Sequence, residues 1–227
     1  MGRPPAPPVR VAAEPAVGTG EPARDCPFCP RLVAFRLENR QRLPHCHNAP
    51  VPSFGALDAR LLIVGLAPGL KGANCSGRPF TGDYAGDLLY ATLLKVGLAE
   101  GSYGRHAADE LQLKGVRVTN AVRCVPPENK PEPAEIRTCN TFLAAEIAAM
   151  PQLEAVLALG AIAHGAVLSA LGLRKSVASF GHGAFHDLPT GLILADSYHC
   201  SRYNTNTNRL TAQMFESVLG ALALRLR

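Results

Sequence analysis

RLLIVGLAPG, at residues 60–69, is the stretch of sequence that decides the fold. Its apolar run is short and ends in glycine and proline, which is typical of a strand buried inside a parallel sheet. Three further runs of the same kind follow, at residues 115–122, 154–160 and 191–197. We therefore expect four buried strands in this chain.

Stretches with helical periodicity separate and follow these runs. They lie at residues 83–97, 133–149, 161–171 and about 207–226. Strands that alternate with helices predict a parallel sheet covered on both faces. The expected fold is a three-layer α/β/α architecture with a central four-stranded parallel sheet.

The N-terminal part of the chain has a different composition. Residues 1–24 are rich in Pro, Ala and Gly and predict a disordered tail, so that residues 25–227 form a single domain. The formal net charge of +5 permits an anionic partner. Because no stretch has the apolar length of a signal peptide or a membrane span, we expect a soluble, cytosolic protein.

Seven cysteines occur in the chain, and an odd number without a secretory signal argues against a disulfide framework. Cys26 and Cys29 form a C-x2-C pair, and Cys124 and Cys139 form a wider C-x14-C pair. Four thiolates fit a tetrahedral zinc ion or a [4Fe–4S] cluster, and their spacing does not separate the two. The alternative is that they are inert, buried side chains. The remaining cysteines are expected to be small packed residues: Cys46, Cys75 and Cys200.

Polar and glycine-rich segments follow the strands, where the carboxyl ends of a parallel sheet hold its active site. The first segment, at residues 65–83, lacks the Walker pattern of a nucleotide cradle. Phe80 at a loop tip offers a stacking platform for a planar ring. Asp83 is interpreted either as a catalytic carboxylate or as the N-cap of the helix that follows.

Two further candidates end the second and fourth strands. The amide of Asn120 can bond both N3–H and O4 of uracil, although an asparagine that merely closes a strand is equally compatible with the sequence. His199 can donate a hydrogen bond to a developing anion. It heads a segment of Ser, Arg, Tyr, Asn and Thr side chains, which are typical of phosphate and nucleotide contacts.

Together these motifs resemble the uracil-DNA glycosylase superfamily. The order is GLAPG, GRPFTGD, TNAVRC, PPENKP and then HCS at residues 199–201. The chain is most similar to the family 5 (type b) enzymes of bacteria and archaea, whose iron–sulfur cysteines match Cys26, Cys29, Cys124 and Cys139. One departure is Cys200, which replaces the proline of the usual HPS motif and is expected to loosen that loop.

The resemblance implies that a nucleotide is flipped from duplex DNA into a pocket. The backbone of residues 65–68, including Gly65 and Ala67, then cradles the base, on which Phe80 stacks. Asn120 reads the base edge, with Asn129 as a second candidate. His199 hydrogen-bonds O2 as the glycosidic bond breaks, and Asp83 stabilises the cationic sugar and orients water.

The resemblance also implies contacts with DNA from residues 201–207. The expected DNA-binding residues are Ser201, Arg202, Tyr203 and Asn204. Phosphate contacts are expected from the arginines within residues 31–42 and from Lys71, Arg78, Arg123 and Arg209. The cluster is expected to be structural, because no electron moves in the reaction.

The leading hypothesis is a monomeric, monofunctional glycosylase in DNA repair, acting on nucleoid DNA, because no lysine is placed as a Schiff-base nucleophile. Family 5 enzymes also accept hypoxanthine and other deaminated bases. One alternative is a non-catalytic metal-binding module with four cysteine ligands that binds nucleic acid. Another is a relative that traps uracil-DNA, which requires a histidine-bearing insertion that the sequence lacks.

Overall fold

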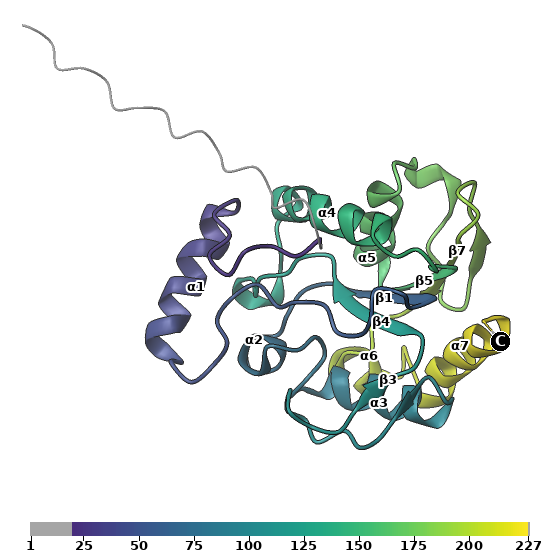
Figure 1. The fold of residues 1–227 in the computed structure, drawn as a ribbon, viewed down its shortest axis with the longest axis horizontal. Coiled ribbons are helices and arrows are strands. Elements are labelled where there is room, and N and C mark those ends of the chain that lie inside the picture. Colours follow the sequence, from purple (N-terminus) through teal and green to yellow (C-terminus); the bar gives the residue numbers. More distant parts are fainter. Residues whose placement is uncertain (1–19, 227) are drawn as a thin grey trace, which may run out of the picture.

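A five-stranded sheet lies at the centre of the computed structural model, which describes residues 20–226 (Figure 1). The strands, in spatial order, are β4 (Val116–Asn120), β1 (Leu61–Gly65), β5 (Ala155–Leu159), β7 (Ile193–Ser197) and β6 (Phe185–Asp187). The first four are parallel, which confirms the predicted strands. The short antiparallel edge strand β6 is an addition that the sequence does not predict, because its three residues carry no apolar run.

Helices cover both faces of the sheet, as predicted (Figure 1). On one face lie α3 (Tyr84–Lys95) and α7 (Ala212–Arg225), and on the other lie α4 (Pro133–Ala148) and α5 (Ala161–Ala170). Alternate residues of β1 take part in the two cores: Ile63 belongs to the cluster of α3 and α7, and Val64 to that of α4 and α5. Every residue of β1 is buried, which explains its unbroken apolar run.

The N-terminal segment packs against this domain through α1 (Pro30–Arg42). Leu32 of α1 contributes to a third apolar cluster with Val122 and Phe142. The predicted tail covers residues 1–24, of which residues 1–19 lie outside the described part. Residues 20–24 lie on the domain, because the Glu21 carboxylate accepts hydrogen bonds from the Ser53 backbone N–H and from buried arginines. The ordered domain thus begins before residue 25.

Smaller elements occupy the predicted loops. They are α2 (Ala73–Ser76), β2 (Ala99–Glu100), β3 (Gln112–Leu113), α6 (Arg202–Asn206) and two 3-10 turns, Pro127–Asn129 and Lys175–Val177. None of the helices in residues 20–226 is long and apolar enough to cross a membrane. A disulfide joins Cys46 to Cys75, which corrects the expectation that both are isolated packed residues.

Candidate active site

A pocket of about 250 Å³ lies where β1, β4 and β7 end. Its lining residues are Ala67, Gly69, Ala73, Phe80, Asp83, Ala85, Asn120 and His199. The structure therefore places on one cavity the four side chains that the sequence singles out, although they are up to 119 residues apart. The carboxyl ends of the parallel strands produce this convergence.

Gly65 allows the side chains to meet at the pocket floor. A Cβ at this position would lie 2.4 Å from both the Asn120 Oδ1 atom and the Phe80 Cζ atom, far inside van der Waals contact. Only glycine leaves room for the ring and the amide at this point. Gly65 is not among the residues that line the cavity, whereas Ala67 lies on its wall.

Phe80 is held in a left-handed backbone conformation, with a φ of +51°. Such a conformation is costly for an aromatic residue and persists only where neighbours fix it. Tyr90 donates a hydrogen bond to the carbonyl of Pro79, and Tyr103 donates one to the carbonyl of Phe80. Gly86 allows this approach, since a Cβ there would overlap the Phe80 carbonyl. The sequence did not predict either tyrosine as a support of the ring.

Asp83 caps a helix and also lines the pocket. Its Oδ1 accepts a hydrogen bond of 3.1 Å from the Gly86 backbone N–H and so caps α3. Its Oδ2 lies beside Gly69 on the pocket wall, where a Cβ on Gly69 would come within 3.0 Å of it. Burial raises the pKa of the Asp83 carboxyl, while hydrogen bonds from the Gly86 and Ala85 N–H groups act in the opposite direction.

Asn120 and His199 present polar side chains to the cavity. Asn120 is 3% exposed, and its side chain lines the cavity wall. The ring of His199 lies 5.9 Å from that of Phe80, centroid to centroid, at an interplanar angle of 28°. Burial lowers the pKa of His199 to about 4, so the imidazole is neutral near pH 7.

The loop that carries His199 is anchored on both sides of the ring. Asn204 Nδ2 donates to the His199 carbonyl at 2.8 Å. Cys200 is fully buried, and its Sγ donates to the Ala85 carbonyl at 3.4 Å. This contact ties the loop to α3.

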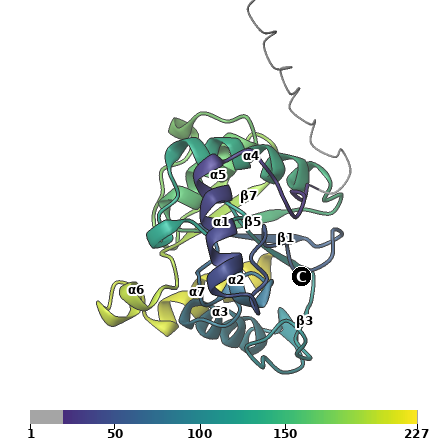
Figure 2. The same cartoon turned by 90° about the vertical axis from the view of Figure 1, so that its left-hand side faces the viewer.

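The pocket opens into a wider cleft of about 1340 Å³. Asn129 lies on the wall of this cleft and not in the inner pocket, together with Ser201, Arg202, Lys71 and Arg105. Neither Tyr203 nor Asn204 lines either cavity. Residues 201–207, predicted as a loop, contain the short helix α6, which Ser201 caps and which projects from the body of the protein (Figure 2). Tyr203 on α6 is 73% exposed.

Several predicted phosphate-binding arginines are instead internal. Arg78 is 5% exposed and forms a bidentate ion pair with Asp109, whose pKa this pair lowers to about 2. Arg123 is 1% exposed and pairs with Glu146. Arg36 is also buried. These three predictions are wrong. Arg78 and Arg123 meet acidic partners, and Arg36 contacts the Cys124 sulfur and the Cys26 carbonyl, none of which a charge pattern reveals.

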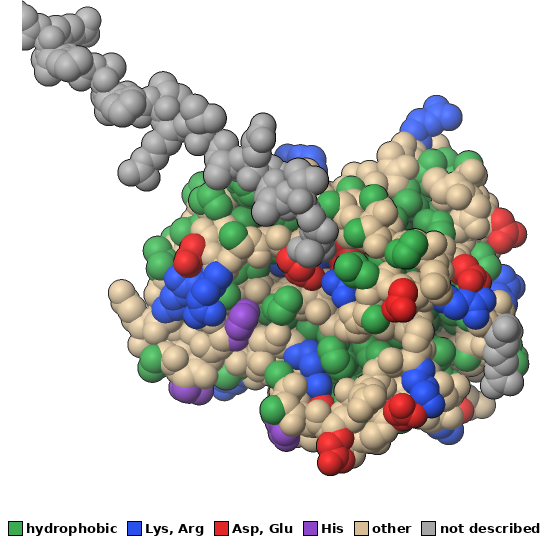
Figure 3. Space-filling view, viewed as in Figure 1, with side chains coloured by type: hydrophobic (Ala, Val, Ile, Leu, Met, Phe, Trp, Pro, Cys, Tyr) green, Lys and Arg blue, Asp and Glu red, His purple; other side chains and the backbone are tan. Residues whose placement is uncertain are grey.

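Exposed basic residues remain beside the cleft. Lys71 and Arg202 are exposed, as is Arg209, whose guanidinium stacks on Tyr198 at 4.5 Å. Figure 3 shows acidic and basic side chains interspersed over the face that it presents, without a large patch of one sign. The basic groups beside the cleft are therefore a better indication of a DNA-binding surface than the overall charge.

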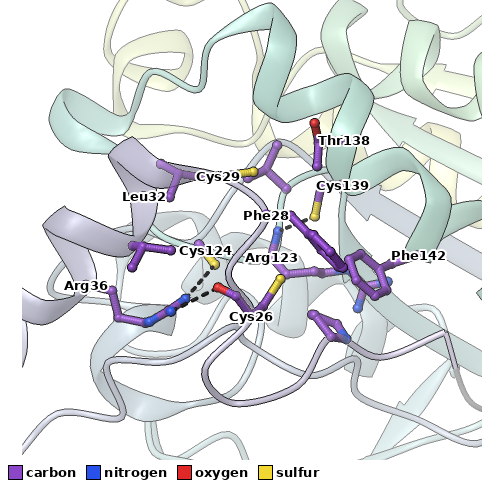
Figure 4. A pocket seen from close by; sticks show the side chains of 13 residues that line it. Cys26, Phe28, Cys29, Leu32, Arg36, Arg123, Cys124, Thr138, Cys139 and Phe142 are labelled. Atoms are coloured by element: carbon purple, nitrogen blue, oxygen red, sulfur yellow. Dashed lines mark hydrogen bonds between the residues drawn. The ribbon is translucent and has the colours of Figure 1, made fainter. Parts of the chain in front are cut away.

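The cysteines of the C-x2-C and C-x14-C motifs face a separate cavity between α1, the end of β4 and α4 (Figure 4). Cys26, Cys29, Cys124 and Cys139 are all free thiols and line this cavity of about 330 Å³. Burial and the neighbouring cysteine raise the pKa of Cys29 to about 11 and that of Cys124 to about 12. A cationic metal centre would offset this penalty, since the metal-bound form of cysteine is the thiolate.

Two hydrogen-bond donors, one of them a cationic side chain, contact these sulfur atoms. The Arg123 backbone N–H donates to Cys139 Sγ at 3.3 Å, and Arg36 approaches Cys124 Sγ at 3.7 Å (Figure 4). The Arg36 Nε atom is buried without a partner in the described chain. Within residues 20–226, no three of the four cysteine sulfurs lie within 4.8 Å of one another. Tetrahedral zinc needs sulfur atoms roughly 3.8 Å apart, so the arrangement favours a larger centre.

Comparisons with known proteins agree with this geometry. The family model described as "Uracil DNA glycosylase superfamily" matches residues 52–223. A type-5 uracil-DNA glycosylase of Thermus thermophilus is 48% identical over 200 residues, which cover 86% of this chain and 90% of the relative. The type-5 enzyme of Mycobacterium tuberculosis is 41% identical over 85% of this chain and 75% of its own length.

Less similar relatives include both type-5 and type-4 uracil-DNA glycosylases. A type-5 enzyme of Pyrobaculum aerophilum is 38% identical over 86% of both chains. A type-4 enzyme of the same organism is 33% identical over only 55% of this chain and 56% of its own length. The match to the type-5 relative thus covers a larger share of this chain than the match to the type-4 enzyme. The chain belongs to the uracil-DNA glycosylase superfamily.

Proposed function

We propose that the protein excises uracil from DNA as a monofunctional glycosylase, at the start of base excision repair. The observation that carries this proposal is the single pocket lined by Phe80, Asp83, Asn120 and His199. An aromatic face, an amide, a carboxylate and a neutral imidazole suit a planar base and the sugar to which it is attached. No lysine of the described chain lines this pocket, which supports hydrolysis without a lyase step.

The extruded base is held by three groups. The Phe80 ring stacks on the face of the uracil, and the Asn120 amide pairs with its N3–H and O4. The glycosidic bond breaks with its electron pair moving onto the base, and the neutral His199 imidazole donates a hydrogen bond to O2 as that oxygen becomes negative. A neutral donor suits this step, because it stabilises the anion without the cost of a buried cation.

The sugar side of the reaction belongs to Asp83. Its carboxylate stabilises the positive charge that develops on the sugar and orients a water molecule, whose hydroxyl oxygen bonds to C1′ while its proton leaves to solvent or base. The Asn129 side chain, on the cleft wall, contacts the nucleotide outside the inner pocket. We infer that it contributes less to recognition of the uracil edge than Asn120.

A uracil-containing oligonucleotide tests the activity directly. Incubation with the protein, followed by alkali, is expected to cleave the strand at the uracil, while omission of alkali leaves it intact. Strand cleavage without alkali would replace the monofunctional proposal by a lyase mechanism. No abasic product at any protein concentration would defeat the glycosylase proposal and favour a non-catalytic module built on the four cysteines.

The substrate range extends to other deaminated bases, including hypoxanthine. The wide cleft above the inner pocket supports this extension, since a purine needs more room than uracil. A panel of oligonucleotides with uracil, hypoxanthine and xanthine measures it. The protein is expected to act as a monomer on nucleoid DNA.

We infer that the four cysteines hold a [4Fe–4S] cluster. Four free thiols that line one cavity support a four-cysteine centre, and the lack of any three of their sulfurs within 4.8 Å of one another in residues 20–226 is what favours a cluster over a single zinc ion. Bound there, the cluster would join the N-terminal segment with α1 to the end of β4 and to α4. It would not take part in hydrolysis, because none of the four cysteines lines the base pocket.

Replacing Cys124 by serine tests this assignment. The variant is expected to lose iron and visible absorption near 400 nm, and to unfold at a lower temperature, because α1 loses its covalent link to the sheet. Iron and sulfide assays and circular-dichroism melting measure the two effects. Cys200→Ser is the matched control: Cys200 lies outside the cavity, and its variant should retain iron. Full iron in Cys124→Ser would remove this cysteine from the ligand set.

Tyr203 is the residue we assign to the gap left by the flipped nucleotide, because it is the most exposed aromatic side chain near the cleft and stands on the projecting helix α6. Replacing it by alanine is expected to cost about 1–3 kcal/mol in kcat/KM on duplex DNA, the range measured for stacking contacts. The loss should be smaller on single-stranded DNA, which has no gap to fill. Equal losses on both substrates would contradict this role.

A further inference from the structure

The disulfide of Cys46 and Cys75 marks a second sulfur-containing site, distinct from the base pocket and from the cavity of the four free cysteines. Cys46 follows α1, and Cys75 lies in α2. His45 adds an exposed imidazole to this pair. The ligand atoms of the three residues all lie within 4.8 Å of one another, and they form the one such group of histidine, cysteine or acidic residues in residues 20–226.

The chain around the two cysteines keeps them together without the sulfur–sulfur bond. The His47 N–H donates to the Cys75 carbonyl at 3.1 Å, and the Asn48 N–H donates to the Asn74 carbonyl at 3.2 Å. The side chains of Asn48 and Asn74, each 1% exposed, are joined by a hydrogen bond of 2.9 Å. Reduction of the disulfide therefore leaves two thiols side by side on a fixed backbone.

Two thiolates and an imidazole are ligand types that zinc prefers, at bond lengths of about 2.0–2.3 Å. The sulfur–sulfur bond holds the two sulfur atoms too close together for both to bind one ion, and reduction frees them to move apart. We propose that the reduced protein binds one Zn²⁺ ion through His45, Cys46 and Cys75, with water in the fourth position. The exposure of His45 leaves that position open to solvent. Formation of the disulfide removes both sulfur ligands and releases the ion.

The chemistry balances with an ordinary thiol–disulfide couple. A small disulfide such as oxidised glutathione takes two electrons from the two cysteines and leaves as two thiols, while the protein gains its sulfur–sulfur bond. Two equivalents of a small thiol reverse the reaction. Zinc binding to the dithiol displaces one proton from each cysteine, so zinc uptake releases acid.

Zinc titration of the cluster-loaded protein tests the proposal. Protein reduced under anaerobic conditions, and freed of reductant, is expected to bind one Zn²⁺ per chain in competition with a chromophoric chelator. Protein oxidised with glutathione disulfide should bind none. Iron and sulfide contents must be the same in both samples, so that zinc in the cluster cavity is not counted.

Matched variants locate the ion. Cys46→Ser and Cys75→Ser are each expected to abolish zinc uptake, and His45→Ala to weaken it measurably. Cys200→Ser and His106→Ala, which change a buried cysteine and an exposed histidine elsewhere, should bind as the unaltered protein does. Melting curves identify any variant that fails to fold. If Cys46→Ser does not fold, Cys46→Ala removes the same sulfur ligand in its place.

Three results would overturn the proposal. They are equal zinc uptake by the reduced and oxidised proteins, no uptake by the reduced protein, and uptake that persists in both cysteine variants. Uracil excision is measured separately on each sample. Loss of excision with intact zinc binding would count against the proposed glycosylase activity and not against this site.

Discussion

Asp83→Asn is expected to slow uracil excision by about 10²–10⁴-fold with little change in stability. In the proposed mechanism the Asp83 carboxylate both caps α3 and stabilises the cationic sugar. This substitution separates the two roles. Asparagine caps helices about as well as aspartate, so its side-chain oxygen can still accept the Gly86 N–H. The amide carries no charge, however, and cannot stabilise a cationic sugar as a carboxylate does.

Asp83→Ala supplies the contrast. This variant loses both the charge and the cap, and the lost cap costs about 0.5–2 kcal/mol of stability. Single-turnover rates and melting temperatures of the two variants should thus show similar rate losses and different stabilities. A near-normal rate in Asp83→Asn would show that Asp83 caps the helix and is not a catalytic carboxylate.

The pH dependence gives an independent check on Asp83. Burial raises the pKa of this carboxyl, so its active, ionised form is lost at a higher pH than for an exposed aspartate. The rate of the unaltered protein is expected to fall as the pH falls through this raised pKa. The residual rate of Asp83→Asn should lack that acid limb. An identical acid limb in both proteins would assign it to another group.

The sequence predicted the parts of the fold that depend on local pattern. Four apolar runs became the four parallel strands, and the polar residues after three of them meet at one pocket. Asn120 and His199 could be found for this reason: position at a strand end is a property of the sequence, and convergence follows from parallel topology.

Other features depend on tertiary partners and left no local signal. The sequence predicts Arg78 as a surface cation. In the structure it is buried and paired with Asp109, which is 31 residues further along the chain. Strand β6 forms only because β7 offers an unpaired edge. Cys46 and Cys75 are 29 positions apart and meet through the backbone contacts of α2. Tyr103 supports Phe80 from a segment without any motif.

His199→Ala is expected to lower the rate of uracil excision by about 10²–10³-fold, the usual cost of losing one donor to a developing anion. His199→Gln retains a donor amide and should recover part of the loss. His106→Ala, which alters an exposed histidine outside the pocket, is the control and should keep the normal rate. Substrate affinity, measured with a non-hydrolysable uracil analogue, should change much less than the rate.

The protonation state of His199 makes this prediction specific. Since burial lowers the pKa of His199 to about 4, the ring stays neutral from pH 5 upward and causes no rate change near pH 6.5. An imidazolium at this position would give a rate that falls as the pH rises through its pKa, and His199→Gln would abolish that fall. With a neutral donor, we instead expect the rates of the unaltered protein and of His199→Gln to follow parallel pH profiles above pH 5, displaced by a constant factor. The two mechanisms thus differ in the shape of the profile, which a loss of folded protein does not alter.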